Sequence, residues 1–222
     1  MGKINLILLD SSLELVPKEL LSHPSVISNA KKKGKDPKFV LLDKSLHYKA
    51  MSRLKDKEKR GRPDIVHLAM LNFLFLEDEI KGDFFLHTID GKIIRVSNKT
   101  RIPKNYNRFT SLMEQLLRYK RVPVNSNEPL MEITDLTLKS LKKKYKLAVL
   151  SEGGEKVPIR DICELGDSWL IGVGAFPHGD FSDEVKANAD RFLSIGDNVL
   201  ETYQVICRLS TVCLSLLGLI RV

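Results

Sequence analysis

The carboxyl-terminal third of the chain contains three short apolar runs, each followed by small or glycine residues. They begin the segments LAVLSEGGE (147–155), WLIGVGAFPHGD (169–180) and RFLSIGDNV (191–199), and a longer apolar segment, Val199 to Leu217, comes last. Short apolar runs bounded by turn residues predict buried strands, and the long segment predicts a helix. Ligands of α/β proteins bind where strands end, and glycine lets the backbone approach a ligand closely, so this region predicts a small-molecule crevice.

The amino-terminal run, Ile4 to Leu9, is interrupted only by Asn5. This is the pattern of a strand buried on both faces, and it predicts a parallel sheet. The next elements are predicted from helix breakers and from apolar spacing. They are a short helix from Pro17 to His23, a charged loop at 29–38, a strand at Phe39–Asp43 and a helix at Ser45–Lys55.

A helix is predicted from Asp64 onward, because Gly61 and Pro63 break the preceding segment and apolar residues then recur at helical spacing. Asp90–Gly91 between two apolar runs is a strong hairpin signal. We interpret residues 83–97 as an antiparallel β extension inserted beside the parallel core. Two further helices are predicted, one following Arg108 and one at Thr134–Tyr145, the latter capped by Thr134 or Asp135.

Charge and cysteine content narrow the class of protein. The 222 residues include 36 Lys and Arg against 28 acidic residues, and the net charge of +8 favours an anionic partner such as nucleic acid. Three cysteines without a CxxC pair or a secretory signal argue for a reducing compartment, against disulfides and for a cytoplasmic location. No segment is long and apolar enough to predict a membrane span, because Glu201 and Arg208 interrupt the last apolar segment.

Several familiar kinds of chemistry lack their motifs. The glycines at 172, 174 and 179 do not fit the dinucleotide fingerprint GxGxxG, and neither a GxxxxGK[ST] phosphate loop nor a GxSxG turn occurs. The five histidines show no metal-ligand spacing, so no metal is expected, and His67 is interpreted as a structural histidine.

What remains is a cofactor crevice together with Arg60, Arg62 and Asp64 at a helix start. Methyl transfer from S-adenosylmethionine suits this inventory, because displacement at an activated methyl needs alignment and exclusion of water more than acid and base groups. A surface ion pair explains these three residues equally well.

Longer motifs point to a known family. They are LELVPKEL near the amino terminus, LLDKSLHYKAM (41–51), RGRPDIVH (60–67), TRIPKNYNRFTSLMEQLL (100–117) and GAFPHG (174–179). Together they resemble the Nep/Emg family of ribosome-biogenesis methyltransferases, in its archaeal form, over essentially the whole chain. The resemblance implies a single domain over residues 1–222 with an α/β fold of the SPOUT type, in which helices flank a mostly parallel sheet. It also implies a carboxyl-terminal trefoil knot and a homodimer.

The same resemblance implies an enzyme that uses S-adenosylmethionine to methylate ring nitrogen 1 of a pseudouridine in small-subunit rRNA during ribosome biogenesis. Its pattern matches rRNA-contacting residues at Arg62, Arg101, Lys104 and Arg108, with Lys104 where the family has Arg. It matches Asp64 as the carboxylate that holds Arg62 in place. Its cofactor loops match Gly174, Gly179, Leu193, Ser194, Ile195, Gly196, Asp197 and Asn198.

Three questions stay open at this point. Asp64 is either the general base that accepts the proton of the ring nitrogen or only the partner that orients Arg62. The chain is either an enzyme or an RNA-binding assembly factor whose methyl transfer is dispensable. A third possibility is a small-molecule α/β enzyme with an incidental basic surface. The salt dependence of RNA affinity would decide it, because several phosphate contacts make that affinity fall by orders of magnitude between low and moderate salt.

Overall fold

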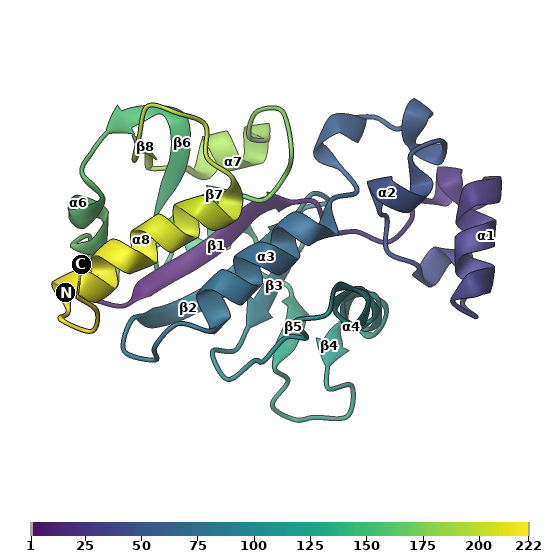
Figure 1. Ribbon diagram of the computed structural model, residues 1–222, viewed down its shortest axis with the longest axis horizontal. Helices are drawn as coiled ribbons and strands as arrows, with labels where there is room; N and C mark the ends of the chain where they lie inside the picture. The colour runs from purple at the N-terminus through teal and green to yellow at the C-terminus, as the bar shows by residue number, and fades with distance from the viewer. Residues whose placement is uncertain (1, 222) are drawn as a thin grey trace.

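The computed structural model of the chain describes residues 2–221, which form one eight-stranded sheet with helices on both faces (Figure 1). The strands are β1 (Ile4–Ser11), β2 (Lys81–Thr88), β3 (Ile93–Val96), β4 (Arg121–Val122), β5 (Met131–Thr134), β6 (Lys146–Lys156), β7 (Trp169–Gly174) and β8 (Arg191–Ser194). Their order across the sheet is β4-β5-β3-β2-β1-β7-β6-β8. The α-helices are α1 (Pro24–Lys32), α2 (Lys44–His47), α3 (Pro63–Leu74), α4 (Tyr106–Tyr119), α5 (Leu138–Leu141), α6 (Ile159–Cys163), α7 (Asp183–Asn188) and α8 (Thr202–Leu216).

The central strand, β1, is buried along its whole length, as the apolar run predicted. It pairs in parallel with β2 and β7, and β6 continues the parallel set to β8. The three predicted carboxyl-terminal strands are therefore confirmed as β6, β7 and β8. Because these strands are parallel, their carboxyl ends meet at one edge of the sheet.

The predicted hairpin is confirmed, since β2 and β3 pair around Asp90 and Gly91 and Gly91 has a φ of +79°. Its interpretation as an insertion outside the parallel core is wrong. β2 pairs with β1 in parallel, so only β3, β5 and β4 form an antiparallel addition. The turn sequence predicted the two strands that it joins, but it does not show which strand pairs with the other edge of β2.

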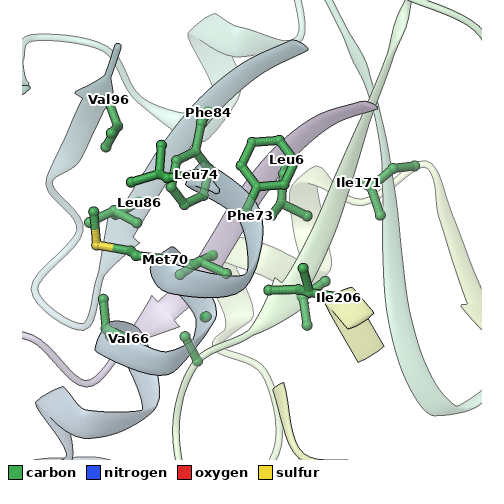
Figure 2. Close-up of a cluster of buried hydrophobic side chains, with 14 of the residues drawn as sticks. Leu6, Val66, Met70, Phe73, Leu74, Phe84, Leu86, Val96, Ile171 and Ile206 are labelled. Carbon is green, nitrogen blue, oxygen red and sulfur yellow. The ribbon is translucent and has the colours of Figure 1, made fainter. Parts of the chain in front are cut away.

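Helices α3 and α8 pack side by side across one face of the sheet, and α5 and α7 pack on the other (Figure 1). Figure 2 shows the buried cluster under α3, in which Phe73 lies against Phe84 with ring centroids 4.8 Å apart. Ile206 of α8 lies in the same cluster, beside Ile171 of β7. The periodic apolar face predicted after Asp64 is thus the face of α3 that covers β1 and β2.

The segment between β1 and α3 folds differently from the prediction. The strand expected at Phe39–Asp43 is wrong. The helix expected at Ser45–Lys55 is broken into α2 and a 3-10 turn at Ala50–Arg53, and the helix expected at Pro17–His23 is only a 3-10 turn at Lys18–Leu20. Helix α1 follows that turn, from Pro24, and extends into the charged loop expected at 29–38. Short 3-10 turns and helices make up this segment, namely η1 (Lys18–Leu20), α1, η2 (Pro37–Phe39), α2, η3 (Ala50–Arg53) and η4 (Lys57–Lys59). Side-chain caps fix where α1 and α2 begin. Asp43 accepts a hydrogen bond from Ser45 N at 2.9 Å, and His23 accepts one from Ser25 N at 3.2 Å.

The helix predicted at Thr134–Tyr145 is also wrong in extent. Thr134 is the last residue of β5, where Ile133 pairs with Ile94 of β3, and α5 starts only after Thr137. A capping box between Thr137 and Ser140 fixes that start. The start of the predicted helix is paired in the sheet instead, and local propensity carries no information about strand pairing.

The expectation that the cysteines form no disulfide is wrong. Cys163 of α6 and Cys213 of α8 are disulfide-bonded, with Cα atoms 5.4 Å apart, and Cys207 is an exposed free thiol. An odd count leaves one cysteine over and does not exclude a pair. The pair is separated by 50 residues, and only the packing of α6 against α8 brings its members together.

Within residues 2–221, every helix is too short or too polar to cross a lipid bilayer.

Candidate functional site

A crevice of about 520 Å³ opens where β6, β7 and β8 end. Its lining comes from three segments, within residues 150–152, 173–181 and 194–205. These are the glycine-containing strand ends that the apolar pattern singled out. The volume lies in the range of about 300–1,000 Å³ that is usual for small-molecule sites.

Six of the eight residues expected to contact a cofactor line this crevice: Gly174, Gly179, Ser194, Ile195, Gly196 and Asn198. The other two lie outside its wall. Leu193 is buried in the core beneath it, and the exposed side chain of Asp197 pairs with Lys156 at 2.5 Å. Leu193 lies in β8 and Asp197 in the loop that follows it, so both are next to lining residues in the chain.

The glycines of the loop after β7 have steric reasons to be glycine. A Cβ on Gly174 would lie 3.0 Å from the Phe176 ring and 3.3 Å from the Phe181 ring. Gly179 has a φ of +101°, a backbone conformation that side-chain-bearing residues rarely adopt. Together they let two aromatic rings, 5.4 Å apart and edge to face, form one wall of the crevice.

Residue-by-residue reasoning from the sequence missed other lining residues. Among them are Phe176 and Phe181, and the acidic side chains Glu152 and Glu201. All of them lie within or next to the three apolar, glycine-containing segments, so the sequence pattern identified the region but not these side chains. Which side chains face the crevice depends on the loop conformation, which the sequence pattern does not specify.

Behind the same loop lies a buried carboxylate, Asp10, at the end of β1. Its Oδ2 accepts hydrogen bonds from Ser182 N at 2.7 Å and from Lys59 Nζ at 3.1 Å, and its Oδ1 accepts one from Ser182 Oγ at 2.9 Å. His87 Nδ1 lies 3.4 Å from Oδ1. We call these four residues the Asp10 cluster.

The cluster joins the crevice loop to the chain just before α3. Lys59 Nζ also donates to the carbonyl oxygen of Asp180 at 2.6 Å and lies 4.3 Å from the centroid of the Phe176 ring. Burial alone would raise the pKa of the Asp10 carboxyl, but hydrogen bonding to His87 and Ser182 and the charge of Lys59 hold that pKa well below its usual value. Asp10 is therefore ionised at neutral pH.

Arg62 and Asp64 form the ion pair that the sequence predicted at the start of α3. Arg62 Nε and Nη2 donate to the two carboxylate oxygens of Asp64 at 2.8 and 2.7 Å. Hydrogen bonding to Asp64 raises the pKa of Arg62, and the charge of Glu201 adds to the rise. Arg62 N donates to Ser12 Oγ at 2.8 Å, and Ser12 N donates to the carbonyl oxygen of Ala175 at 2.8 Å. Because Ala175 lies between two residues that line the crevice, these hydrogen bonds hold the ion pair next to the crevice loop.

Arg60 does not join this pair, contrary to expectation. Its guanidinium donates to both carboxylate oxygens of Glu14, at 2.7 and 2.5 Å, and both side chains are largely buried. The side chains of Arg60 and Arg62 therefore have different partners. Only Arg62, whose side chain is 40% exposed, presents its charge to solvent.

The other expected RNA-contacting residues are exposed, two of them at the carboxyl end of α3 and one at the start of α4. Arg101 and Lys104 both extend over the Phe75 ring, at 5.7 and 5.5 Å from its centroid, at the carboxyl end of α3. Arg108 lies in the first turn of α4. Given a rise of about 1.5 Å per residue, Phe75 lies roughly 20 Å from Arg62 along the helix. Arg62, Arg101, Lys104 and Arg108 therefore do not converge on one point. We call these four residues the basic strip.

The interpretation of His67 as a structural histidine is confirmed. Its Nε2 lies 2.8 Å from the carbonyl oxygen of Pro103, and its ring stacks on Phe109 with centroids 4.3 Å apart. In the part of the chain from residue 2 to 221, no group of three or more His, Cys, Asp or Glu side chains is placed to hold a metal ion.

An α/β protein with a strand-end crevice beside a basic strip belongs to the class that brings a small cofactor to an anionic substrate. Comparison with known proteins narrows this class. The model of the family described as EMG1/NEP1 methyltransferase matches residues 6–214, so the chain belongs to that family.

Named relatives agree with this assignment. A protein of Sulfurisphaera tokodaii named ribosomal RNA small subunit methyltransferase Nep1 is 60% identical over 97% of this chain and 99% of its own length. The protein of the same name from Saccharolobus solfataricus is 54% identical over 97% of this chain and 98% of its own. A crystal structure of Archaeoglobus fulgidus Nep1 bound to S-adenosylhomocysteine is 33% identical, with a TM-score of 0.90 over 98% of this chain and 100% of that one.

We predict that Asp10→Asn lowers the free energy of unfolding by roughly 1–3 kcal/mol at pH 7, because buried donors lose their charged acceptor. The folded-state pKa of Asp10 is lowered, so its contribution is complete above the unfolded pKa of about 3.9 and is lost as pH falls below that value. Urea unfolding of both proteins between pH 7 and pH 3 should show the difference shrinking below about pH 4.

The matched control is Asp36→Asn, since Asp36 is about half exposed and pairs with the exposed Lys38. Its effect should stay within about 0.5 kcal/mol. A difference between wild type and Asp10→Asn that stays constant down to pH 3 would contradict an ionised, stabilising Asp10.

Proposed function

We propose that this chain is an S-adenosylmethionine-dependent methyltransferase of small-subunit rRNA, and that it methylates ring nitrogen 1 of a pseudouridine. The observation that carries the proposal is the strand-end crevice, whose loop is linked to Arg62 through Ser12, in a chain that shares its fold and family with a Nep1 crystallised with S-adenosylhomocysteine. Pseudouridine specificity follows from the sequence resemblance. We also propose that residues 1–222 act as one unit in the cytoplasm and that the carboxyl-terminal segment adopts the trefoil threading of the family.

The residues of the crevice fit such a cofactor. Gly174 leaves open the space that a Cβ would fill beside Phe176 and Phe181, and the loop at Ser194–Asn198 offers main-chain groups. Aromatic walls suit an adenine ring, and main-chain donors and acceptors suit its polar edge. The bound cofactor would supply an electrophilic methyl group on its sulfonium. The protein's own part is alignment and exclusion of water.

Arg62 is the residue that links the two sites. Its ion pair with Asp64 is 40% exposed on both sides, so the interaction is worth at most about 1 kcal/mol. Asp64 binds Nε and Nη2 of the guanidinium, which leaves Nη1 to donate to an RNA phosphate. Asp64 therefore acts by orienting Arg62. Both carboxylate oxygens of Asp64 accept from the guanidinium, and this geometry favours the orienting role over that of a general base.

The remaining basic strip is suited to the backbone on either side of an unpaired target. Arg101, Lys104 and Arg108 are exposed, and Arg and Lys contacts to phosphates position an RNA without reading its sequence. Proteins that modify a base recognise it outside the helical stack. The strip therefore holds the flanking strand while the target base enters the crevice.

A homodimer is part of the proposal. Large apolar side chains remain exposed on the outward faces of the two adjacent helices: Leu68 and Phe75 at α3, and Tyr203 and Leu216 on α8. Several exposed large apolar side chains on two adjacent helices are typical of an interaction site. Sedimentation velocity at micromolar concentration should give a dimer, whereas Leu68→Lys with Tyr203→Lys should give a monomer. A monomeric wild type would contradict this part of the proposal.

The proposed reaction predicts a sharp substrate preference. With labelled S-adenosylmethionine, label should enter an rRNA hairpin that carries pseudouridine at the unpaired target position. It should not enter the same hairpin with uridine there, because the corresponding ring nitrogen of uridine bonds to ribose and has no proton to lose. Absence of label from both, with cofactor and RNA still bound, would instead favour an assembly factor whose methyl transfer is dispensable.

The role of Asp64 predicts a separation of kinetic parameters. Asp64→Asn should raise the KM for the pseudouridine hairpin about tenfold, since Arg62 loses a charged hydrogen-bond partner, and should leave kcat nearly unchanged. Asp161→Asn, an exposed acidic residue in the first turn of α6, is the control and should change neither. A large loss of kcat at saturating RNA would show that Asp64 is the general base.

A further inference from the structure

A second, smaller hollow lies in the segment between β1 and α3. Its volume is about 110 Å³, and it is formed by α2, η3 and η4. Met51, which is buried, lies at its inner side, and Tyr48, whose side chain is 68% exposed, lies at its rim. We call it the Tyr48 pocket.

Three lysines, Lys44, Lys49 and Lys57, line the Tyr48 pocket with a single carboxylate, Glu58. Glu58 lies 3.4 Å from Lys44. Across residues 2–221 no carboxylate lies within 4.0 Å of Lys49 or Lys57. The lining therefore carries a net positive charge beside an exposed aromatic ring, a combination that suits a nucleotide, since the ring stacks on a base and lysines contact phosphates.

The pocket adjoins the basic strip at two points. On one side, Lys44 N donates to the carbonyl oxygen of Gly61 at 2.7 Å, and a Cβ on Gly61 would lie 2.9 Å from Met51 Cε. Gly61 immediately precedes Arg62. The floor of the pocket thus packs against the residue that leads into the Arg62–Asp64 ion pair.

On the other side, the cap of α2 connects the pocket to α4. Asp43 Oδ1 accepts from Ser45 N, and its Oδ2 accepts from the hydroxyl of Tyr106 at 2.6 Å. Burial and this hydrogen bond raise the pKa of Tyr106, so the hydroxyl remains a donor. Tyr106 lies in the chain between Lys104 and Arg108. Helix α2 is therefore held between both parts of the proposed RNA surface.

We propose that the Tyr48 pocket binds an unpaired nucleotide of the substrate rRNA close to the methylated position, with its base on Tyr48 and its phosphates at Lys49 and Lys57. This subsite rests on the proposed function, because its ligand is another part of the same RNA. It extends recognition from the target base to a neighbouring base.

The experiment measures the affinity of a labelled rRNA hairpin by fluorescence anisotropy, with pseudouridine at the unpaired target position. Tyr48→Ala should weaken binding about tenfold, as expected for one lost base stack, and Tyr48→Phe should bind as wild type. Tyr119→Ala removes another exposed tyrosine, at the far end of α4, and should have no effect. Cofactor affinity should be the same in all four proteins.

Hairpins with one abasic nucleotide at a time then locate the base. One unpaired position near the target should weaken wild-type binding about tenfold and leave Tyr48→Ala binding unchanged, because the two changes remove the same stack. For the lysines, Lys49→Ala with Lys57→Ala should reduce the slope of log affinity against log salt by about 0.7 per contact. Lys139→Ala with Lys143→Ala, on and after α5, is the control of equal charge.

The possible results distinguish failure of the proposed Tyr48 subsite from failure of the proposed function. If wild type methylates the hairpin and Tyr48→Ala binds it as tightly, the subsite is overturned and the function stands. Weaker binding by Tyr48→Ala without any coupled abasic position also overturns it, since no base then stacks on Tyr48. If wild type neither binds nor methylates the hairpin, the proposed function fails and the subsite fails with it.

Discussion

A buried carboxylate requires charged or hydrogen-bonding partners, and at Asp10 those partners come from three distant parts of the chain. Ser182 belongs to the crevice loop, Lys59 to the segment before α3, and His87 to β2. Leaving a buried hydrogen-bonding group without its partner costs about 1–3 kcal/mol, so this arrangement is favoured over its alternatives. The end of the central strand thereby fixes the crevice loop and, through Lys59, the start of the helix that carries Arg62.

Arg60 and Arg62 are two residues apart, and their different burial gives one a structural role and the other a functional role. Arg60 and Glu14 are largely buried and bind each other through two hydrogen bonds, so that pair holds the segment before α3 in place. Arg62 and Asp64 have the same bidentate geometry but are 40% exposed, where solvent reduces the interaction to about 1 kcal/mol or less. Only the exposed arginine can donate to a phosphate while its carboxylate still orients it. This difference is what makes Arg62 suitable for RNA.

The two proposed sites share one scaffold. The crevice is built from loops at the ends of β6, β7 and β8, and the basic strip follows α3 and the start of α4. Both are held to the same sheet, because α3 and α8 pack together across one face of it, α3 on β1 and α8 on β7, and the disulfide ties α6 to α8. The distance between cofactor and RNA is therefore set by packing, while the residues that touch either ligand lie on loops and helix starts.

The sequence by itself determined the buried central strand, the three carboxyl-terminal strands, the Asp90–Gly91 turn, α3 and the glycine loops of the crevice. Each depends on local spacing or on a residue's own conformational freedom, which a single chain segment carries in full. Only the tertiary structure decided the parallel partner of β2, the bond between Cys163 and Cys213, the partner of Arg60 and the Asp10 cluster. These depend on residues that are far apart in sequence, and their pairing follows from which surfaces are buried together. In the segment between β1 and α3 both kinds of information are needed. Its helix caps are local in sequence, but hydrogen bonds to Gly61 and Tyr106 hold the cap of α2 in place.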